Sequence, residues 1–177
     1  INKSLQGSIP QNYSYFISRD AESFKQVAVK DDLFPKVSIL CSTYNHEMFI
    51  DRTMAGFFEQ EKDFSFEIIV SDDASTDATF DKLSIWKKKF PDIIKLIKFH
   101  KNIYQSSGRR PTEVLISEAK GKYIAICEGD DFWVNPRKLQ CQVDILDKYP
   151  SLMSTTHNFF KFDTSKMELK EHYKLGK

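Results

Sequence analysis

Three carboxylic acids follow the apolar run at residues 123–127: Glu128, Asp130 and Asp131. Close carboxylates repel one another and lose hydration beside a sheet, so such a group belongs either in open water or around a cation. Carboxylates are hard oxygen ligands, and no His or Cys pattern accompanies them, so Mg²⁺ or Mn²⁺ suits Asp130 and Asp131 better than zinc does. The intervening Gly129 lets the backbone turn tightly and lets a ligand approach.

Polar side chains also follow the three earlier apolar runs. They are Ser42 and Tyr44, Asp72 and Asp73, and Lys101 with Asn102. Mg²⁺ in proteins usually binds one or two carboxylates together with substrate phosphates, so a nucleotide diphosphate is the ligand that fits. Asp72 or Asp73 can accept a hydrogen bond from a base N–H, and a base stacked on Tyr44 gains about 1–3 kcal/mol. Lys101 can balance the phosphate charge.

Other polar residues have a more ordinary explanation. Arg109 and Arg110 can also face a phosphate, but an adjacent pair of arginines is more often solvated at the surface. His46, His100 and His157 each stand alone in the sequence, so we expect surface or core roles for them rather than catalysis.

Strand and helix patterns alternate along the chain. Strands are expected at 37–41, 66–70, 93–99, 123–127 and 152–160, and helices at 20–30, 47–60, 111–120 and 136–149 and between residues 77 and 91. The run at 123–127 has no polar member, so it is expected to be a central strand covered on both faces.

Such alternation predicts an α/β fold of the Rossmann-like kind, with a mostly parallel sheet and helices on both faces. Ligands of these sheets bind outside the carboxyl ends of the strands. Since all the polar clusters fall at those ends, a shared binding site is favoured over a set of solvated turns.

Composition indicates a single folded domain. The 177 residues include 15 Phe and 7 Tyr for a core, and 26 basic against 25 acidic residues give no case for binding nucleic acid by bulk charge. We interpret residues 1–35 as an N-terminal extension, 36–160 as the domain and 161–177 as a C-terminal tail. Three cysteines without C-x-x-C spacing favour a reducing, cytoplasmic location. No window approaches the roughly 20 apolar residues of a membrane span.

Four segments in a fixed order resemble a known family. They are VSILCSTYN at 37–45, FEIIVSDDASTD at 66–77, AKGKYIAICEGDDFW at 119–133 and PRKLQCQV at 136–143. Over about residues 36–158 the chain is similar to the nucleotide-binding half of family 2 glycosyltransferases, which have the GT-A fold. The resemblance implies a metal-dependent, inverting transfer of a sugar from a nucleotide-diphosphate donor, with UDP as the nucleotide, to an acceptor hydroxyl.

The resemblance also assigns roles to the first two polar clusters. Ser42 and Tyr44 would hold and stack the uracil of a UDP-sugar, and Asp72, with Asp73 beside it, would contact the base or the ribose. Lys101 would join this donor-binding set.

The acidic cluster matches the DXD metal motif of the family. Asp130 would be the direct ligand of a Mn²⁺ or Mg²⁺ ion that bridges the diphosphate, with Asp131 beside it. Glu128 stands where the family more often has Asp, and a ribose contact is expected for it. The general base of relatives lies in an acceptor-binding half far downstream, and no segment after Asp131 matches that half, so the chain is expected to be part of a longer enzyme.

The acceptor class stays open among a glycan, a lipid-linked molecule and a protein. Polysaccharide biosynthesis is the expected process, and peripheral association with the inner face of the membrane is compatible with it. A non-catalytic nucleotide-sugar-binding module and a sugar nucleotidyltransferase are the alternative functions. The latter normally has a Gly-rich loop after the first strand, where this chain has Ser42 to Asn45.

Overall fold

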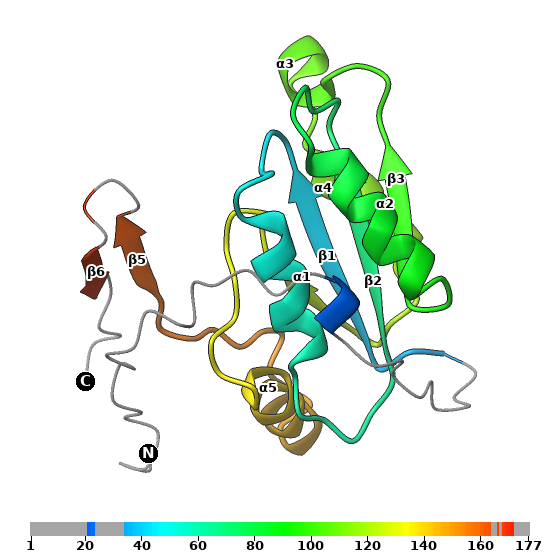
Figure 1. The fold of residues 1–177 in the computed structure, drawn as a ribbon. Coiled ribbons are helices and arrows are strands. Elements are labelled where there is room, and N and C mark those ends of the chain that lie inside the picture. The colour runs from blue at the N-terminus through cyan, green and yellow to red at the C-terminus, as the bar shows by residue number, and fades with distance from the viewer. Residues whose placement is uncertain (1–20, 24–33, 164–165, 167, 172–177) are drawn as a thin grey trace.

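Four parallel strands form the centre of the structure, a computed structural model that describes residues 21–23, 34–163, 166 and 168–171. The strands are β1 (Val37–Thr43), β2 (Phe66–Asp72), β3 (Ile94–Lys98) and β4 (Tyr123–Ile126). Their order across the sheet is β3-β2-β1-β4, and each neighbouring pair is parallel. Their carboxyl ends therefore meet at one edge of the sheet. Figure 1 shows β1 and β3 pointing toward this edge.

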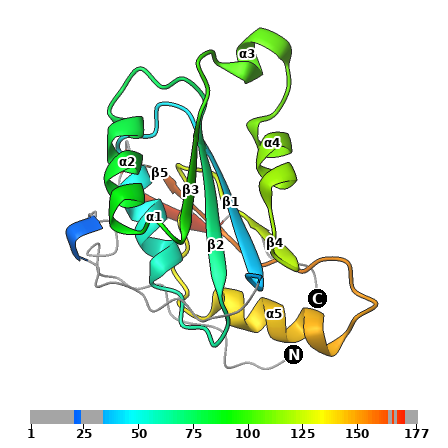
Figure 2. The same ribbon diagram turned by 90° about the vertical axis from the view of Figure 1, so that its right-hand side faces the viewer.

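Helices cover both faces of this sheet. α1 (Ile50–Phe58) and α2 (Thr79–Lys89) lie on one face and α4 (Pro111–Glu118) lies on the other (Figure 2). α5 (Lys138–Lys148) lies near the amino ends of the strands, and the short α3 (Ile103–Ser107) lies beyond their carboxyl ends. The predicted α/β fold class, with a mostly parallel sheet and helices on both faces, is confirmed.

The alternation of side chains along each strand creates the two apolar layers. Ile39 and Cys41 of β1 join the larger core cluster, which also contains Phe57 of α1. Leu40, between them, points to the opposite face and packs with Leu115 of α4 in a smaller cluster. No helix in the part of the chain that the structure describes is long and apolar enough to cross a bilayer.

The expectation that the run at 123–127 is a central strand is wrong. Among the described strands β4 is at the edge of the sheet, paired only with β1. Tyr123 and Ala125 pack against the larger core, but Ile124 and Ile126 on the other face are 46% and 58% exposed. α4 covers that face mainly over β1 and β2, so apolar composition predicted more burial than the described elements provide.

Three other expectations also differ from the structure. Residues 152–159 form no strand, because the chain finds no ladder partner before β5 (Phe160–Asp163), which pairs antiparallel with β6 (Glu168–Glu171). The expected helix at 20–30 is described only at η3 (Ala21–Ser23), a 3₁₀ turn, and its remainder lies outside the described residues. The last major helix begins at Lys138 rather than at 136, after a turn in which Asn135 Oδ1 accepts from the Arg137 N–H.

The division into residues 1–35, 36–160 and 161–177 stays a prediction, and most of residues 1–35 lies outside the described part.

Asp147 of α5 ties this helix to the amino ends of β1 and β4. Its carboxylate accepts hydrogen bonds from Lys122 Nζ and from the Tyr123 hydroxyl, both 2.7 Å long, and lies 2.7 Å from Lys36 Nζ. These bonds, that of Lys122 first, hold the pKa of Asp147 far below its ordinary value.

Asp147→Asn is therefore expected to lower the melting temperature at pH 7. Because the folded-state pKa is lowered, the stabilisation is present above the ordinary aspartate pKa and is lost as the pH falls through the folded-state value. The difference between wild type and variant should shrink in acid and in high salt. The control is Asp144→Asn, which changes a carboxylate on the same helix whose one hydrogen bond with the described residues is from Gln140. An equal loss for the two variants at pH 7 would contradict this explanation.

Candidate functional site at the carboxyl edge of the sheet

The ends of β2 and β4 are both joined to the end of β1 by backbone hydrogen bonds. The Asp73 N–H donates to Thr43 O at 2.9 Å, and the Gly129 N–H donates to Ser42 O at 3.0 Å. The segment after β2 and the acidic loop, residues 128–133, therefore lie on opposite sides of the β1 exit. The structure brings the predicted residues that follow β1, β2 and β4 to one edge.

The loops after β1 and β2 are interlocked. Asn45 has a positive φ of 54°; its N–H donates to Ser75 Oγ and its Oδ1 accepts from the Thr76 N–H. The Glu47 N–H donates to Asp77 Oδ2. Burial alone would raise the pKa of Asp77, but hydrogen bonds from the Thr79 hydroxyl and from backbone N–H groups outweigh it and hold the pKa below its ordinary value. This interlock fixes the segment that carries Tyr44.

Asp72 keeps one carboxylate oxygen without a partner. The side chain is fully buried at the end of β2, and its Oδ2 accepts from the Ser75 N–H at 3.2 Å. Its Oδ1 is buried and has no hydrogen-bond partner among the described residues. Buried polar atoms are nearly always paired, so an unpaired acceptor at a strand end indicates a site for a ligand donor. Tyr44, 36% exposed, and the half-buried Ser42 belong to the neighbouring β1 exit.

Asp73 has a structural partner instead. Its carboxylate accepts from the Ile103 N–H at 2.7 Å and from the Tyr104 N–H at 3.3 Å, the first two residues of α3. Asp73 is only 2% exposed, and it anchors the segment that carries the exposed Lys101. Arg109, farther along, pairs with Glu113 at the surface.

The acidic loop holds its three carboxylates in exposed positions. Glu128, Asp130 and Asp131 are all exposed, and none of them has an ion pair with Lys or Arg within the described part of the chain. Partial burial, then the charges of Asp130 and Glu128, raise the pKa of Asp131, while His46 and His157 act in the opposite direction. The loop thus carries concentrated negative charge with which no described Lys or Arg pairs.

The donor set of this loop fits a hard divalent cation. No group of three His, Cys, Asp or Glu side chains among the described residues is arranged to enclose a metal ion. Mg²⁺ and Mn²⁺ do not need such an enclosure when one or two carboxylates, water and substrate phosphates complete the ligand set. A cation would also relieve the repulsion that raises the pKa of Asp131.

His46, for which the sequence predicts a surface or core role, lies beside the acidic loop. Its Nε2 lies 3.9 Å from Asp130 Oδ2, and its Nδ1 is buried without a hydrogen-bond partner in the described chain. The absence of a side chain at Gly129 lets the loop backbone lie close to His46 and Thr43, because a Cβ there would lie 2.8 Å from His46 Nδ1 and 2.5 Å from Thr43 Cγ2. The feature of the sequence that could have indicated this location is that His46 directly follows the polar residues at the end of the first strand.

The chain is similar to several known proteins. The family model described as Glycosyl transferase family 2 matches residues 38–174. The uncharacterized Mycobacterium tuberculosis protein Rv1520 is 36% identical over 121 residues, which cover 68% of this chain and 34% of that protein. The Escherichia coli protein named UDP-Glc:alpha-D-GlcNAc-diphosphoundecaprenol beta-1,3-glucosyltransferase WfaP is 31% identical over 127 residues, covering 72% of this chain and 47% of WfaP.

The chain is also similar to a solved structure. TarS 1–349 from S. aureus, in complex with UDP-GlcNAc, is similar with a TM-score of 0.56 and 28% identity, covering 65% of this chain and 32% of that chain. The chain spans about a third of the length of the first curated relatives that it matches.

The role found for Asp73 leads to a local prediction. Asp73→Asn replaces a charged acceptor by an amide, and a hydrogen bond to a charged group is worth about 1.5–3 kcal/mol. Hydrogen exchange of the Ile103 and Tyr104 amides should therefore become faster by about tenfold or more. Asp72→Asn is the matched control, because its Oδ2 accepts from Ser75 and not from α3. Unchanged exchange at 103 and 104 in Asp73→Asn would refute the anchoring role.

Proposed function

Because the chain belongs to glycosyl transferase family 2, we propose that it binds a UDP-sugar at the carboxyl edge of its sheet. There it takes part in transferring the sugar to an acceptor hydroxyl with inversion. The observation that carries the donor part of this proposal is the unpaired, buried Oδ1 of Asp72. The similarity to TarS, whose solved complex contains UDP-GlcNAc, supports the same nucleotide.

The base lies on the β2 side of the site in this proposal. Uracil has an N3–H donor, and Asp72 Oδ1 is an acceptor that lacks one. Tyr44 offers an exposed ring in the interlocked loop for stacking, and Ser42 lies just before it at the end of β1. Asp73 contributes by holding the segment of Lys101, which can reach a phosphate or ribose oxygen, rather than by contacting the base itself.

The diphosphate lies on the acidic-loop side. Asp130 would hold a Mn²⁺ or Mg²⁺ ion directly, Asp131 would assist it, and Glu128 would contact the ribose. A bound divalent cation supplies charge stabilisation for a leaving diphosphate. The residues of the chain present the exposed carboxylates for it, at the opposite side of β1 from the base.

The transfer forms a bond from the acceptor oxygen to the anomeric carbon and breaks the bond from that carbon to the diphosphate oxygen. A general base must take the proton of the acceptor hydroxyl. The proposal assigns no described residue to this step. The acceptor is a glycan, a lipid-linked molecule or a protein; WfaP is named for a lipid-diphosphate acceptor. A cytoplasmic location at the inner face of the membrane would suit an acceptor of that kind.

Calorimetry with UDP, with and without Mn²⁺, tests the two sides separately. Asp72→Ala should weaken UDP binding about tenfold or more in both conditions, because a base donor loses its acceptor. Asp130→Ala should remove most of the gain that Mn²⁺ gives. Metal-free binding should not weaken, because the variant removes a negative charge beside the diphosphate.

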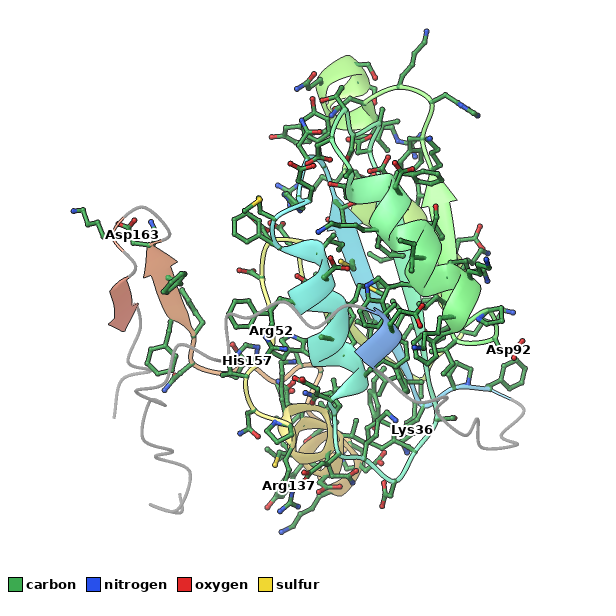
Figure 3. All side chains as sticks on the ribbon, viewed as in Figure 1. Lys36, Arg52, Asp92, Arg137, His157 and Asp163 are labelled. Carbon is green, nitrogen blue, oxygen red and sulfur yellow. The ribbon has the colours of Figure 1, made fainter. Side chains whose placement is uncertain are left out.

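Asp92→Ala is the control, since Asp92 is exposed at the opposite end of the sheet, before β3 (Figure 3). The proposal would be abandoned if wild type showed no Mn²⁺-dependent UDP binding, or if Asp130→Ala kept the full effect of the metal.

A further inference from the structure

The backbone of the acidic loop rests on α1 through Thr53. The Thr53 hydroxyl oxygen lies 2.9 Å from Gly129 O and 2.6 Å from Asp131 O. Thr53 is fully buried. The two carbonyls belong to the residues on either side of Asp130, so a single hydroxyl contacts the loop backbone before and after the proposed metal ligand.

Two further residues of α1 complete the contact. A Cβ at Gly56 would lie 3.1 Å from Trp133 O and 3.2 Å from Trp133 N, and the Phe57 and Trp133 ring centroids are 4.8 Å apart. Thr53, Gly56 and Phe57 are spaced i, i+3 and i+4, which places them on one face of the helix. We call these three residues the α1 seat of the acidic loop.

The neighbouring Arg52 adds a contact to the middle of the loop. Its guanidinium carbon lies 5.1 Å from the centre of the Phe132 ring, and its Nη1 pairs with Glu59 Oε2 at 2.9 Å. The loop is therefore held along its length by α1, while its charged side chains remain exposed.

The contacts of Thr53 differ from those of an ordinary helical threonine. A Thr hydroxyl inside a helix commonly donates to the carbonyl four residues earlier, here Phe49 O at 3.3 Å. A hydroxyl has one proton, and both loop carbonyls are nearer than Phe49 O. The hydroxyl therefore hydrogen-bonds to the loop rather than to its own helix.

We propose that Thr53 is a positioning residue of the donor site, which fixes the backbone around Asp130 so that the carboxylates are already placed for a cation and a diphosphate. This inference rests on the proposed function. Groups that orient metal ligands typically change metal affinity 10–100-fold when they are lost. Loss of the hydroxyl should act on metal-dependent binding alone, because Asp72 and Tyr44 contact the base from the β2 side of the site.

Two substitutions and one control isolate the hydroxyl. Thr53→Val keeps the shape of the side chain and removes the hydroxyl, and Thr53→Ser keeps the hydroxyl. Ser84→Ala removes a hydroxyl of α2 that donates only to its i−4 carbonyl, Phe80 O, at 2.8 Å. Circular dichroism first verifies that each variant is folded.

Acrylamide quenching of tryptophan fluorescence reports on the loop without any ligand. The chain has two tryptophans; Trp86 is fully buried and Trp133, in the loop, is 6% exposed. Thr53→Val should raise the quenching constant by about twofold, because local opening exposes the loop tryptophan. Thr53→Ser and Ser84→Ala should match wild type.

The Mn²⁺ dependence of UDP binding, measured by calorimetry, is the second readout. In Thr53→Val the Mn²⁺ concentration for half-maximal effect should rise about tenfold, while metal-free UDP affinity stays unchanged. Thr53→Ser and Ser84→Ala should both show the wild-type Mn²⁺ dependence.

The possible outcomes separate this inference from the proposed function. Wild-type quenching together with wild-type Mn²⁺ dependence in Thr53→Val overturns the inference, and so does an equal loss of UDP binding with and without metal. If the wild-type chain shows no Mn²⁺-dependent UDP binding, the proposed function and the donor-site role of Thr53 fail together. The quenching result then decides by itself whether Thr53 holds the loop.

Discussion

The candidate site depends on two backbone hydrogen bonds at the end of β1. Thr43 O accepts from the Asp73 N–H and Ser42 O accepts from the Gly129 N–H, at 2.9 and 3.0 Å. Because β1 lies between β2 and β4, it is the strand whose end can join both sides of the site. The parallel register, in which Thr43 is opposite Asp72 and Leu40 is opposite Ile126, brings the two acidic segments to the same edge.

The carboxylates after β2 and those after β4 have different surroundings. On the β2 side, Asp73 and Asp77 accept hydrogen bonds from backbone N–H groups, and one oxygen of Asp72 has no partner among the residues that the structure describes. On the β4 side, the carboxylates of the acidic loop are exposed and repel one another, while α1 contacts the backbone and the aromatic rings of the loop. One side therefore offers a single directional acceptor, as a base requires, and the other offers negative charge for a cation and its diphosphate.

Much of this arrangement is present in local sequence patterns. Strand and helix alternation predicts the parallel sheet, and the polar residues after each strand predict the edge where the candidate site lies. The resemblance to family 2 glycosyltransferases is confirmed. Apolar residues at 123–127 predict burial but not the neighbour that supplies it, so the edge position of β4 was missed. The contacts of Asp73 with α3 and of Thr53 with the acidic loop join residues 30 and 76 positions apart, and no local pattern contains them.

The central claim is that Asp72 Oδ1 accepts the N3–H of uracil. Calorimetric comparison of UDP with N3-methyl-UDP tests it most directly, because the methyl group removes that proton and leaves the ribose and diphosphate intact. The account predicts that UDP binds about tenfold or more tightly than the methylated nucleotide, since a buried acceptor is otherwise left unpaired. Equal affinities for the two nucleotides would contradict the account.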